Sequence, residues 1–287
     1  MATTGGVFDR AAEVAERLQQ APGEEARQEL GLPDGVPPAR WQLRTIRASV
    51  PSLADYTLSG IWRLLQRSHL RLRSAHGQLY SPDPEYQTKV DRLCTCLREA
   101  ALHPETMVFL FLDEMGYYRW PDPAPDWSRL PPVATRDGNN RQQRLIGAFN
   151  ALTGRVDYLD AYIIGREKVG LFYRQLDAVY ADAQTIYVAQ DNWSIHRHPD
   201  VLAVLETVPR IQPIWLPTYA PWLNPIEKLW RWLRETVLKL HRQAGDWQAL
   251  RQRVNAFLEQ FAPGSEPLLH YVGLRGEGKL ATCLQVA

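Results

Sequence analysis

The chain has 287 residues, 45% of them hydrophobic, and a formal net charge of +1 at pH 7. This apolar content is enough to bury one large core or two smaller ones, so we expect a soluble globular protein. No run of eighteen or more apolar residues occurs, and the first residues lack the basic and apolar regions of a signal peptide. These features argue against a membrane or exported protein and predict a cytoplasmic one.

The cysteines and the glycines exclude two further classes of protein. Cys94, Cys96 and Cys283 are too few for a disulfide framework and lack the spacing of a four-ligand zinc site. We therefore expect three reduced thiols. The sequence also has no Gly-rich phosphate-binding loop, which argues against the use of ATP.

The first 39 residues predict an N-terminal helix and a loose connection. Residues 8–20 are polar with a helical pattern, and Pro and Gly residues break the stretch that follows them. Little regular structure is therefore expected between residue 21 and residue 39.

Residues 40–82 predict a small winged helix-turn-helix domain that binds DNA. Apolar residues fit one helix face at 41–50, and a second helix begins at Leu58. Residues 70–73 alternate like a short strand, for which 77–80 would be the partner. No acidic residue occurs from Ser59 to Pro82, and a helical subdomain without DNA contact is the alternative. The candidate phosphate contacts are Arg63, Arg67, Arg71 and Arg73.

The pattern from residue 83 onward predicts a linker helix at 83–104 and an α/β domain at 105–287. Its mixed five-stranded sheet would have flanking helices, with the first and fourth strands side by side, an order that matches the ribonuclease H-like fold. Strands are expected at 107–113, 144–150, 156–164, 185–191 and 211–216, and helices at 166–181, 198–207 and 225–240.

Three carboxylates stand at the ends of these elements. Asp113 and Asp191 each follow an apolar strand, and Glu227 lies in the first turn of a helix. If the sheet gathers them, their oxygens would form a site for hard divalent cations. Glu114 is the fallback for Asp113, because successive residues of a strand face opposite sides and only one can share a pocket with Asp191.

Local explanations compete with the metal site. Asn224 suits the N-cap position, and Glu227 follows it by three residues, so the two could form a capping box. Asn192 is either a residue that orients its neighbours or a turn residue. His196 and His198 are expected to be surface residues or phosphate contacts, with metal binding as the alternative.

Three segments carry a resemblance to a known family. The segments Phe111–Glu114, Ala189–His196 and Leu216–Trp230 resemble the three catalytic blocks of the mariner superfamily of DDE transposases, in its bacterial insertion-sequence branch. Thirty-five residues separate Asp191 from Glu227, similar to the short interval of that superfamily. Residues 41–80 resemble its winged helix-turn-helix, and the resemblance extends over about residues 40–275.

The resemblance implies a ribonuclease H-like transposase that cuts transposon ends and joins them to target DNA at TA. Asp113, Asp191 and Glu227 would hold two Mg²⁺ ions, for which Mn²⁺ could substitute, in a two-metal endonuclease and strand transferase. A homodimer on double-stranded DNA is expected, because two ends must be joined. The alternative is a domesticated DNA-binding protein that no longer cuts. Cations that could track the DNA backbone are Lys228, Arg231 and Arg234.

Overall fold

The computed structural model describes most of the chain, as two compact units. The units are Met1–Gly77 and Gln78–Ala287. Within the described residues, no helix is both long enough and apolar enough to cross a membrane. The described residues are 4–36, 38–72, 80–127, 129–130, 132–276, 278 and 280–284.

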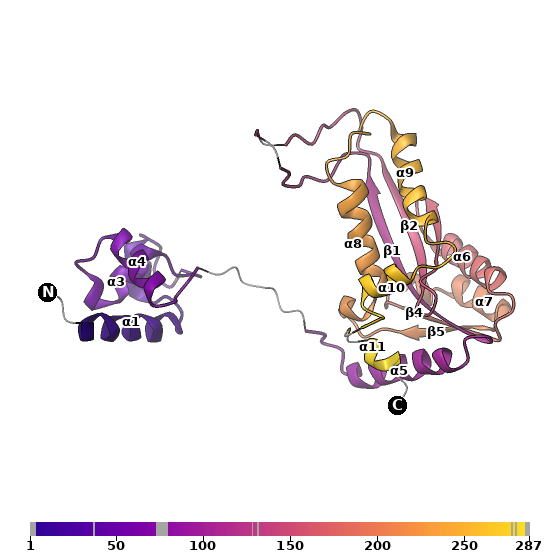
Figure 1. The fold of residues 1–287 in the computed structure, drawn as a ribbon, viewed down its shortest axis with the longest axis horizontal. Helices are drawn as coiled ribbons and strands as arrows, with labels where there is room; N and C mark the ends of the chain where they lie inside the picture. The colour runs from indigo at the N-terminus through magenta and orange to yellow at the C-terminus, as the bar shows by residue number, and fades with distance from the viewer. Residues whose placement is uncertain are drawn as a thin grey trace. The chain divides into compact units, whose positions relative to one another are not determined.

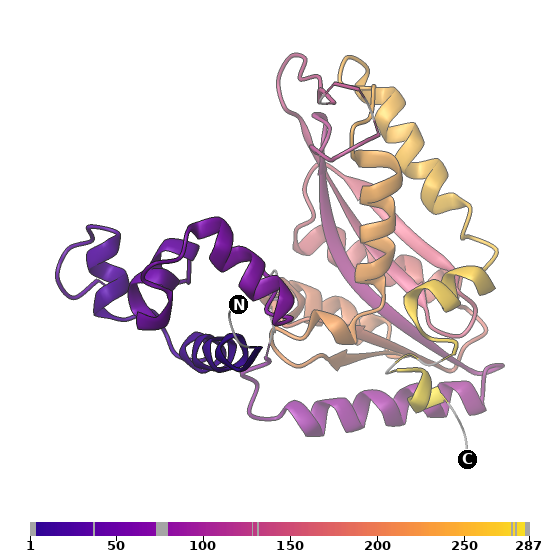
Figure 2. The ribbon, with the colours of Figure 1, turned by 60° about the vertical axis from the view of Figure 1, so that its left-hand side comes forward.

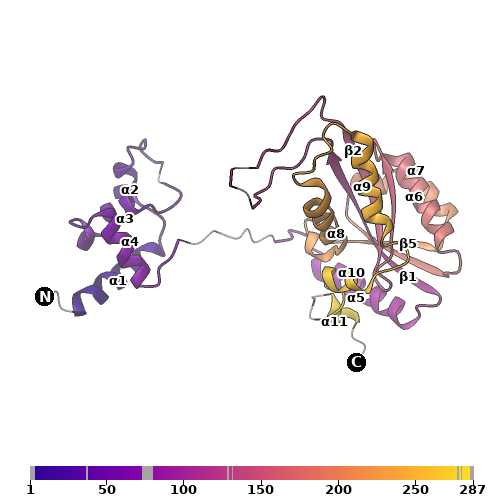
Figure 3. The ribbon, with the colours of Figure 1, turned by 45° about the horizontal axis from the view of Figure 1, so that its top comes forward.

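The first unit is helical (Figure 3). Its core joins the first helix to the later ones, since Val14 of α1 packs with Ile46 of α3 and with Ile61 and Leu64 of α4. The Thr57 hydroxyl caps α4 by accepting a hydrogen bond from the Gly60 amide at 3.1 Å. The helices are α1 (Thr4–Leu18), α2 (Glu24–Glu29), α3 (Leu43–Ser49) and α4 (Leu58–Arg67).

Two expectations for this unit are corrected. The connection after α1 contains regular structure, because α2 forms within it. Acidic residues in the first turn of α2 favour the helix, and Arg27 donates a hydrogen bond to the Leu32 carbonyl at 2.6 Å. The first arm of the expected wing is not a strand over 70–72, where the apolar alternation is too short and Leu72 is almost fully exposed. The rest of the wing, apart from Tyr80, lies outside the described residues.

The second unit contains the expected mixed sheet of five strands, in the order β3-β2-β1-β4-β5. The first three strands are antiparallel neighbours, and β4 and β5 continue the sheet in parallel with β1. The expected pairing of the first and fourth strands is confirmed. The strands are β1 (Met107–Tyr118), β2 (Gln142–Asn150), β3 (Val156–Ala161), β4 (Thr185–Gln190) and β5 (Ile211–Trp215).

Strand β1 does not end at Asp113 as expected but continues to Tyr118. Its pairing with β4 stops at Phe111, whereas its pairing with β2 continues through Asp113 to Tyr118. Asp113 therefore lies just beyond the point at which β1 loses its neighbour β4, while the strand itself continues beside β2. We call the point where β1 and β4 separate the fork.

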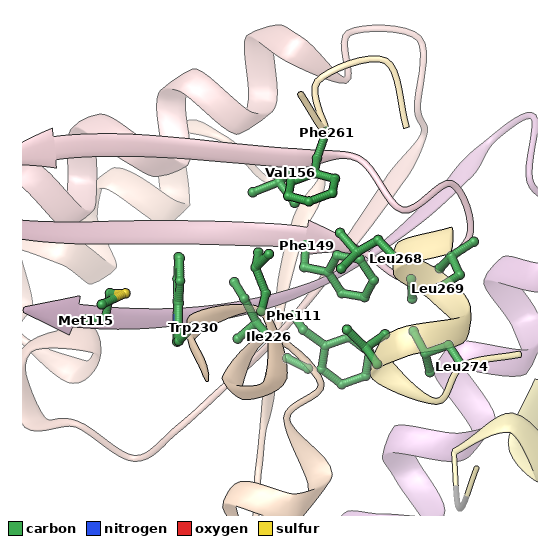
Figure 4. Packing of buried hydrophobic residues seen from close by; sticks show 14 of the residues in the cluster. Phe111, Met115, Phe149, Val156, Ile226, Trp230, Phe261, Leu268, Leu269 and Leu274 are labelled. Carbon is green, nitrogen blue, oxygen red and sulfur yellow. The ribbon is translucent and has the colours of Figure 1, made fainter. Parts of the chain in front are cut away.

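Helices cover both faces of the sheet (Figures 1 and 2). Helices α6 (Arg166–Val179) and α7 (Pro199–Thr207) pack on the face that carries Leu110 and Leu112. The other face, which carries Phe111 and Met115, packs against α5, α8, α9 and α10. Figure 4 shows Ile226 of α8 beside Phe111, and Trp230 of α8 on the side of Met115. These helices are α5 (Tyr86–Leu102), α8 (Ile226–Leu233), α9 (Trp247–Glu259) and α10 (Glu266–Val272).

The helix expected at 225–240 is interrupted. After α8 the chain makes a π-helical turn at Arg234–Leu238, and Leu240 then adopts a positive φ of 47°. Asp122, in the long segment between β1 and β2, pairs with this region: its amide donates to the Leu238 carbonyl, and its carbonyl accepts from the Leu240 amide, both at 3.0 Å. This pairing ends the helical path.

The expectation of three reduced thiols is wrong for one pair. Cys94 on α5 and Cys283 on α11 (Ala281–Leu284) form a disulfide, and Cys96 is free and buried. The two cysteines are 189 positions apart, and they meet because α11 folds back beside α5 (Figure 1). No local pattern in the sequence reveals that contact.

Candidate active site

Asp113 lies at the fork between β1 and β4. Phe111 is the last residue of β1 that pairs with β4, and Asp113 comes two positions after it. The two side chains therefore lie on the same face of the strand. That face is covered by α8. The side chain of Asp113 is therefore directed into the space that opens between the end of β4 and α8.

A tryptophan and a glycine hold Asp113 in place. The indole N–H of Trp230, on α8, donates a hydrogen bond to Oδ2 of Asp113 at 3.0 Å. Gly147 of β2 pairs with Asp113 in the sheet, and a Cβ at this position would lie 2.6 Å from the Trp230 ring. The absence of a side chain at Gly147 is thus what lets the indole lie close enough to reach the carboxylate.

Asp191 follows β4 directly and is exposed. One of its oxygens accepts a hydrogen bond from the Trp193 amide at 2.9 Å, which fixes the turn that begins there. Asn192 is an orienting residue rather than a simple turn residue. Its amide donates to the Leu216 carbonyl at 2.7 Å, and its oxygen accepts from Arg197 at 2.8 Å.

Glu227 lies in the first turn of α8, but it does not form the expected capping box. The Asn224 side chain makes no cap; instead its amide donates to the Leu112 carbonyl of β1 at 3.1 Å. Asn224 therefore ties the start of α8 to the strand that carries Asp113. Burial raises the pKa of Glu227, while Arg231 and Arg234 act in the opposite direction.

One cavity of about 430 Å³ brings the three carboxylates together: Asp113, Asp191 and Glu227 all line it, with Asn192 and Asn224. Burial, followed by the nearby charges of Glu227 and Asp191, raises the pKa of Asp113 to about 8. Each carboxylate disfavours the ionised form of its neighbours, and a bound cation would offset this repulsion. The all-oxygen donor set fits hard divalent ions such as Mg²⁺ and Mn²⁺.

A second acidic group lies on the opposite face of β1. Glu114 is directed away from the cavity, and its Oε1 lies 3.5 Å from Nε2 of His196, which in turn is 3.7 Å from Asp191. His196 is completely buried, so the expectation of a surface histidine is wrong. Burial, followed by the charges of Asp113 and Asp191, raises the pKa of Glu114 well above its ordinary value, and burial lowers the pKa of His196 to about 4.

Oε1 of Glu114 and both ring nitrogens of His196 are buried and make no hydrogen bond within the described residues. The alternation of faces in β1 could have predicted the place of Glu114. The burial of His196 depends on the 3₁₀ turn Ser194–Arg197, which no motif indicates.

Residues ahead of α5, which sequence reasoning treated only as a linker, support the cavity. The buried carboxylate of Asp83 accepts from Lys89 and from the Thr218 amide, both at 2.8 Å, and these bonds hold its pKa well below the usual range. Ser81 donates to the Thr218 carbonyl at 2.5 Å. Thr218 belongs to the loop that receives Asn192, so this segment fixes one wall of the cavity.

The residues expected to contact DNA differ in their exposure and in their bonds to the rest of the protein. Arg63, Arg67 and Arg71 are exposed in the first unit, and Arg73 lies outside the described residues. On the α8 side, Arg231 and Arg234 follow Glu227 by four and seven residues and are exposed. Lys228 donates to the Val272 carbonyl at 2.8 Å and thus closes the end of α10.

Solved structures match this fold. A Mos1 transposase paired-end complex with left transposon end has a TM-score of 0.62 and 12% identity, covering 96% of this chain and 77% of that one. A Mos1 mariner paired-end complex with Mn matches at 0.63 and 13% identity over the same shares. The sheet and its helices thus have the ribonuclease H-like arrangement.

Sequence comparisons agree with the fold. A protein of Shigella sonnei, described as an insertion element IS630 uncharacterized 39 kDa protein, is 28% identical over 239 residues, which cover 80% of this chain and 67% of that protein. A family profile described as DDE superfamily endonuclease matches residues 108–251, which is half of the chain and includes Asp113, Asp191 and Glu227. The chain belongs to this DDE endonuclease superfamily.

Proposed function

We propose that the protein is a transposase that cuts transposon ends and joins them to target DNA. The observation that carries this proposal is the cavity lined by Asp113, Asp191 and Glu227, in which burial, followed by the neighbouring carboxylates, raises the pKa of Asp113. A protein that only bound DNA would gain nothing from three carboxylates placed where they repel phosphates. With divalent cations bound, the same cluster becomes attractive to a phosphodiester.

Asp113, Asp191 and Glu227 would hold two Mg²⁺ ions, or Mn²⁺ in their place. When bound, such ions supply Lewis acidity and lower the pKa of a coordinated water. The oxygen donors fit these ions, and the raised pKa of Asp113 means that its proton must leave as the ion enters.

The other residues position these groups. The Trp230 indole keeps one oxygen of Asp113 in place, and Asn224 fixes the start of α8 against β1. Arg231 and Arg234 would attract the DNA backbone beside Glu227.

In the first step, water adds to phosphorus, the bond to the 3′ oxygen breaks, and that oxygen leaves as a 3′-hydroxyl. In the second step the 3′-hydroxyl would take the place of water: its oxygen bonds to a target phosphorus at TA, the bond from that phosphorus to the target's 3′ oxygen breaks, and the target strand leaves with a 3′-hydroxyl.

The first unit would recognise the transposon end. Arg63 and Arg67 on α4 and Arg71 after it are exposed cations, and no described acidic side chain forms an ion pair with them. A short basic helix of this kind suits the major groove of a duplex. Since two ends must be joined, we propose that two copies act together on DNA.

Cleavage of a duplex that carries the terminal inverted repeats of the element tests the proposal. Purified full chain with Mg²⁺ or Mn²⁺ should cut this duplex, and Asp113→Ala, Asp191→Ala or Glu227→Ala should each remove cutting while gel-shift binding remains. Asp182→Ala is the matched control, because Asp182 is an exposed aspartate that does not line the cavity.

Two outcomes would contradict the proposal. Full cleavage by the Glu227→Ala variant would remove Glu227 from the metal site. Tight binding of the repeats by the unchanged chain, without cutting in either metal, would favour the domesticated DNA-binding protein.

A further inference from the structure

We propose that Tyr219 is a platform on which a nucleobase next to the cleaved phosphodiester stacks. The inference rests on the proposed function, because it assumes that DNA enters the carboxylate cavity. Tyr219 lines that cavity together with Asp113, Asp191 and Glu227. Its side chain is 74% exposed and makes no hydrogen bond or ring contact with the rest of the described chain. An aromatic ring thus stands free at the edge of the site.

The backbone at Tyr219 holds the ring in this position at an energetic cost. Tyr219 has φ 53°, a left-handed conformation that is uncommon for a residue with a large side chain. Such conformations persist only where the surrounding structure enforces them, and they concentrate at functional sites. Here Asp83 and Ser81 bind the amide and the carbonyl of Thr218, and the next residue, Ala220, is buried.

The neighbouring aromatic residue has a different role. Trp222 is half as exposed as Tyr219, and its indole N–H donates to the hydroxyl of Tyr86 at 3.1 Å. Trp222 therefore fastens the loop to α5. Of the two rings, Tyr219 is the one that is free to meet a ligand.

The chemistry of the cavity selects a nucleobase as that ligand. A phosphodiester drawn to the carboxylate site and to Arg231 would bring the adjoining bases to the edge of the cavity. A base that leaves its stack beside the cleaved bond would meet this ring, and an aromatic face compensates for the lost stacking with any base. Tyr219 supplies that face without needing a particular base sequence.

Single-turnover cleavage of the repeat duplex by the full chain tests the role of the ring. Tyr219→Ala should lower the rate roughly tenfold, the loss expected for one base–aromatic stack, and Tyr219→Phe should keep it. The alanine variant keeps the backbone preference of a non-glycine residue, so the ring alone is removed. Tyr162→Ala is the matched control, since Tyr162 is 70% exposed just beyond β3 and does not line the cavity.

A modified substrate separates stacking from a structural effect. An abasic site next to the cleaved bond should slow the unchanged chain about as much as Tyr219→Ala does. It should slow the Tyr219→Ala variant no further, because both changes remove the same contact. With 2-aminopurine at that position and EDTA present, binding by the unchanged chain or by the Tyr219→Phe variant should quench the fluorescence, and binding by the Tyr219→Ala variant should not.

The outcomes that overturn the inference are distinct from failure of the proposed function. Additive losses from the abasic site and Tyr219→Ala, or equal quenching by the unchanged chain and the alanine variant, would exclude the stack while cleavage itself stands. A rate loss together with a change in oligomeric mass, and no change in quenching, would assign Tyr219 to a protein interface. Failure of the proposed function would instead appear as no cleavage by the unchanged chain.

Discussion

Asp113 and Glu114 are neighbours in β1, yet they occupy opposite environments. Asp113 faces α8 and a cavity that it shares with two other carboxylates, whereas Glu114 faces a buried histidine on the side of α6 and α7. The pleat of the strand alone separates them. One carboxyl group thereby lines the carboxylate cavity, and the next packs against a buried imidazole.

Burial is the first cause of the raised pKa at both carboxyl groups, but the groups around them differ. At Asp113, nearby negative charges add to burial, and a cation would reverse the effect. At Glu114, the charges of Asp113 and Asp191 also add to burial, and Nε2 of His196 lies 3.5 Å from its Oε1. The first carboxyl group shares its cavity with Asp191 and Glu227, whereas the second lies in a cluster with Asp191 and His196 whose ligand atoms are all within 4.8 Å of one another.

Replacing Asp113 and Glu114 in turn with the corresponding amide should separate their roles most clearly. Asp113→Asn should lower cleavage by at least about 10³-fold, because metal ligation is worth several kcal/mol to the transition state. Glu114→Gln should lower it by less than about tenfold, since an amide resembles the neutral acid. Single-turnover rates in saturating Mg²⁺ measure both. A loss at Glu114→Gln as large as that at Asp113→Asn would identify Glu114 as the ligand.

Filling the space at Gly147 should disturb the Asp113 side alone. A methyl group there would press on the Trp230 ring, so Gly147→Ala should destabilise the fold by about 1–3 kcal/mol in urea unfolding. It should also weaken Mg²⁺ binding through the displaced indole. Gly116→Ala is the control, because a Cβ there meets no atom nearer than 3.5 Å. Equal stability losses in the two variants would contradict the role given to Gly147.

The pH dependence of metal binding should sharpen the comparison further. Asp113 has a folded pKa of about 8 against an ordinary value of 3.8, so between these pH values the metal-free folded state binds more protons than the unfolded state. Its stability therefore falls as pH rises through this window, and Mg²⁺ restores it by displacing the proton. The stabilisation by Mg²⁺ should grow by up to about 1.4 kcal/mol per pH unit from about pH 6 to about pH 8.

Thermal unfolding with and without Mg²⁺ at both pH values measures this effect. Asp113→Asn should remove the pH dependence, and Glu114→Gln should retain it. A Mg²⁺ effect that is independent of pH in the unchanged chain would show that the proton on Asp113 does not compete with the ion.

Sequence patterns were sufficient for the parts of the site that lie on regular elements. Apolar runs ending in an acid indicated Asp113 and Asp191, and strand alternation separated Asp113 from Glu114. The order of strands and helices was enough to predict the mixed sheet. These signals are local, because the period of the backbone decides which way each side chain points.

The supports of the site could not be predicted in this way. Trp230 reaches Asp113 only because Gly147 leaves room on a third element, and Asp83 meets Thr218 across 135 positions of sequence. The capping box failed for the same reason. The Asn224 side chain is oriented by donation from its Nδ2 to the Leu112 carbonyl of β1, distant in sequence, and the Oδ1 that would cap α8 makes no hydrogen bond within the described residues.

The docking of α8 has a consequence for the order in which the site is completed. Asp113 and Asp191 are present once β1 and β4 have paired, but Glu227 arrives only when Asn224 and Trp230 attach α8 to β1. Glu227 also lies later in the chain than the whole sheet. A partly synthesised or partly unfolded molecule therefore lacks the third of the carboxylates that line the cavity.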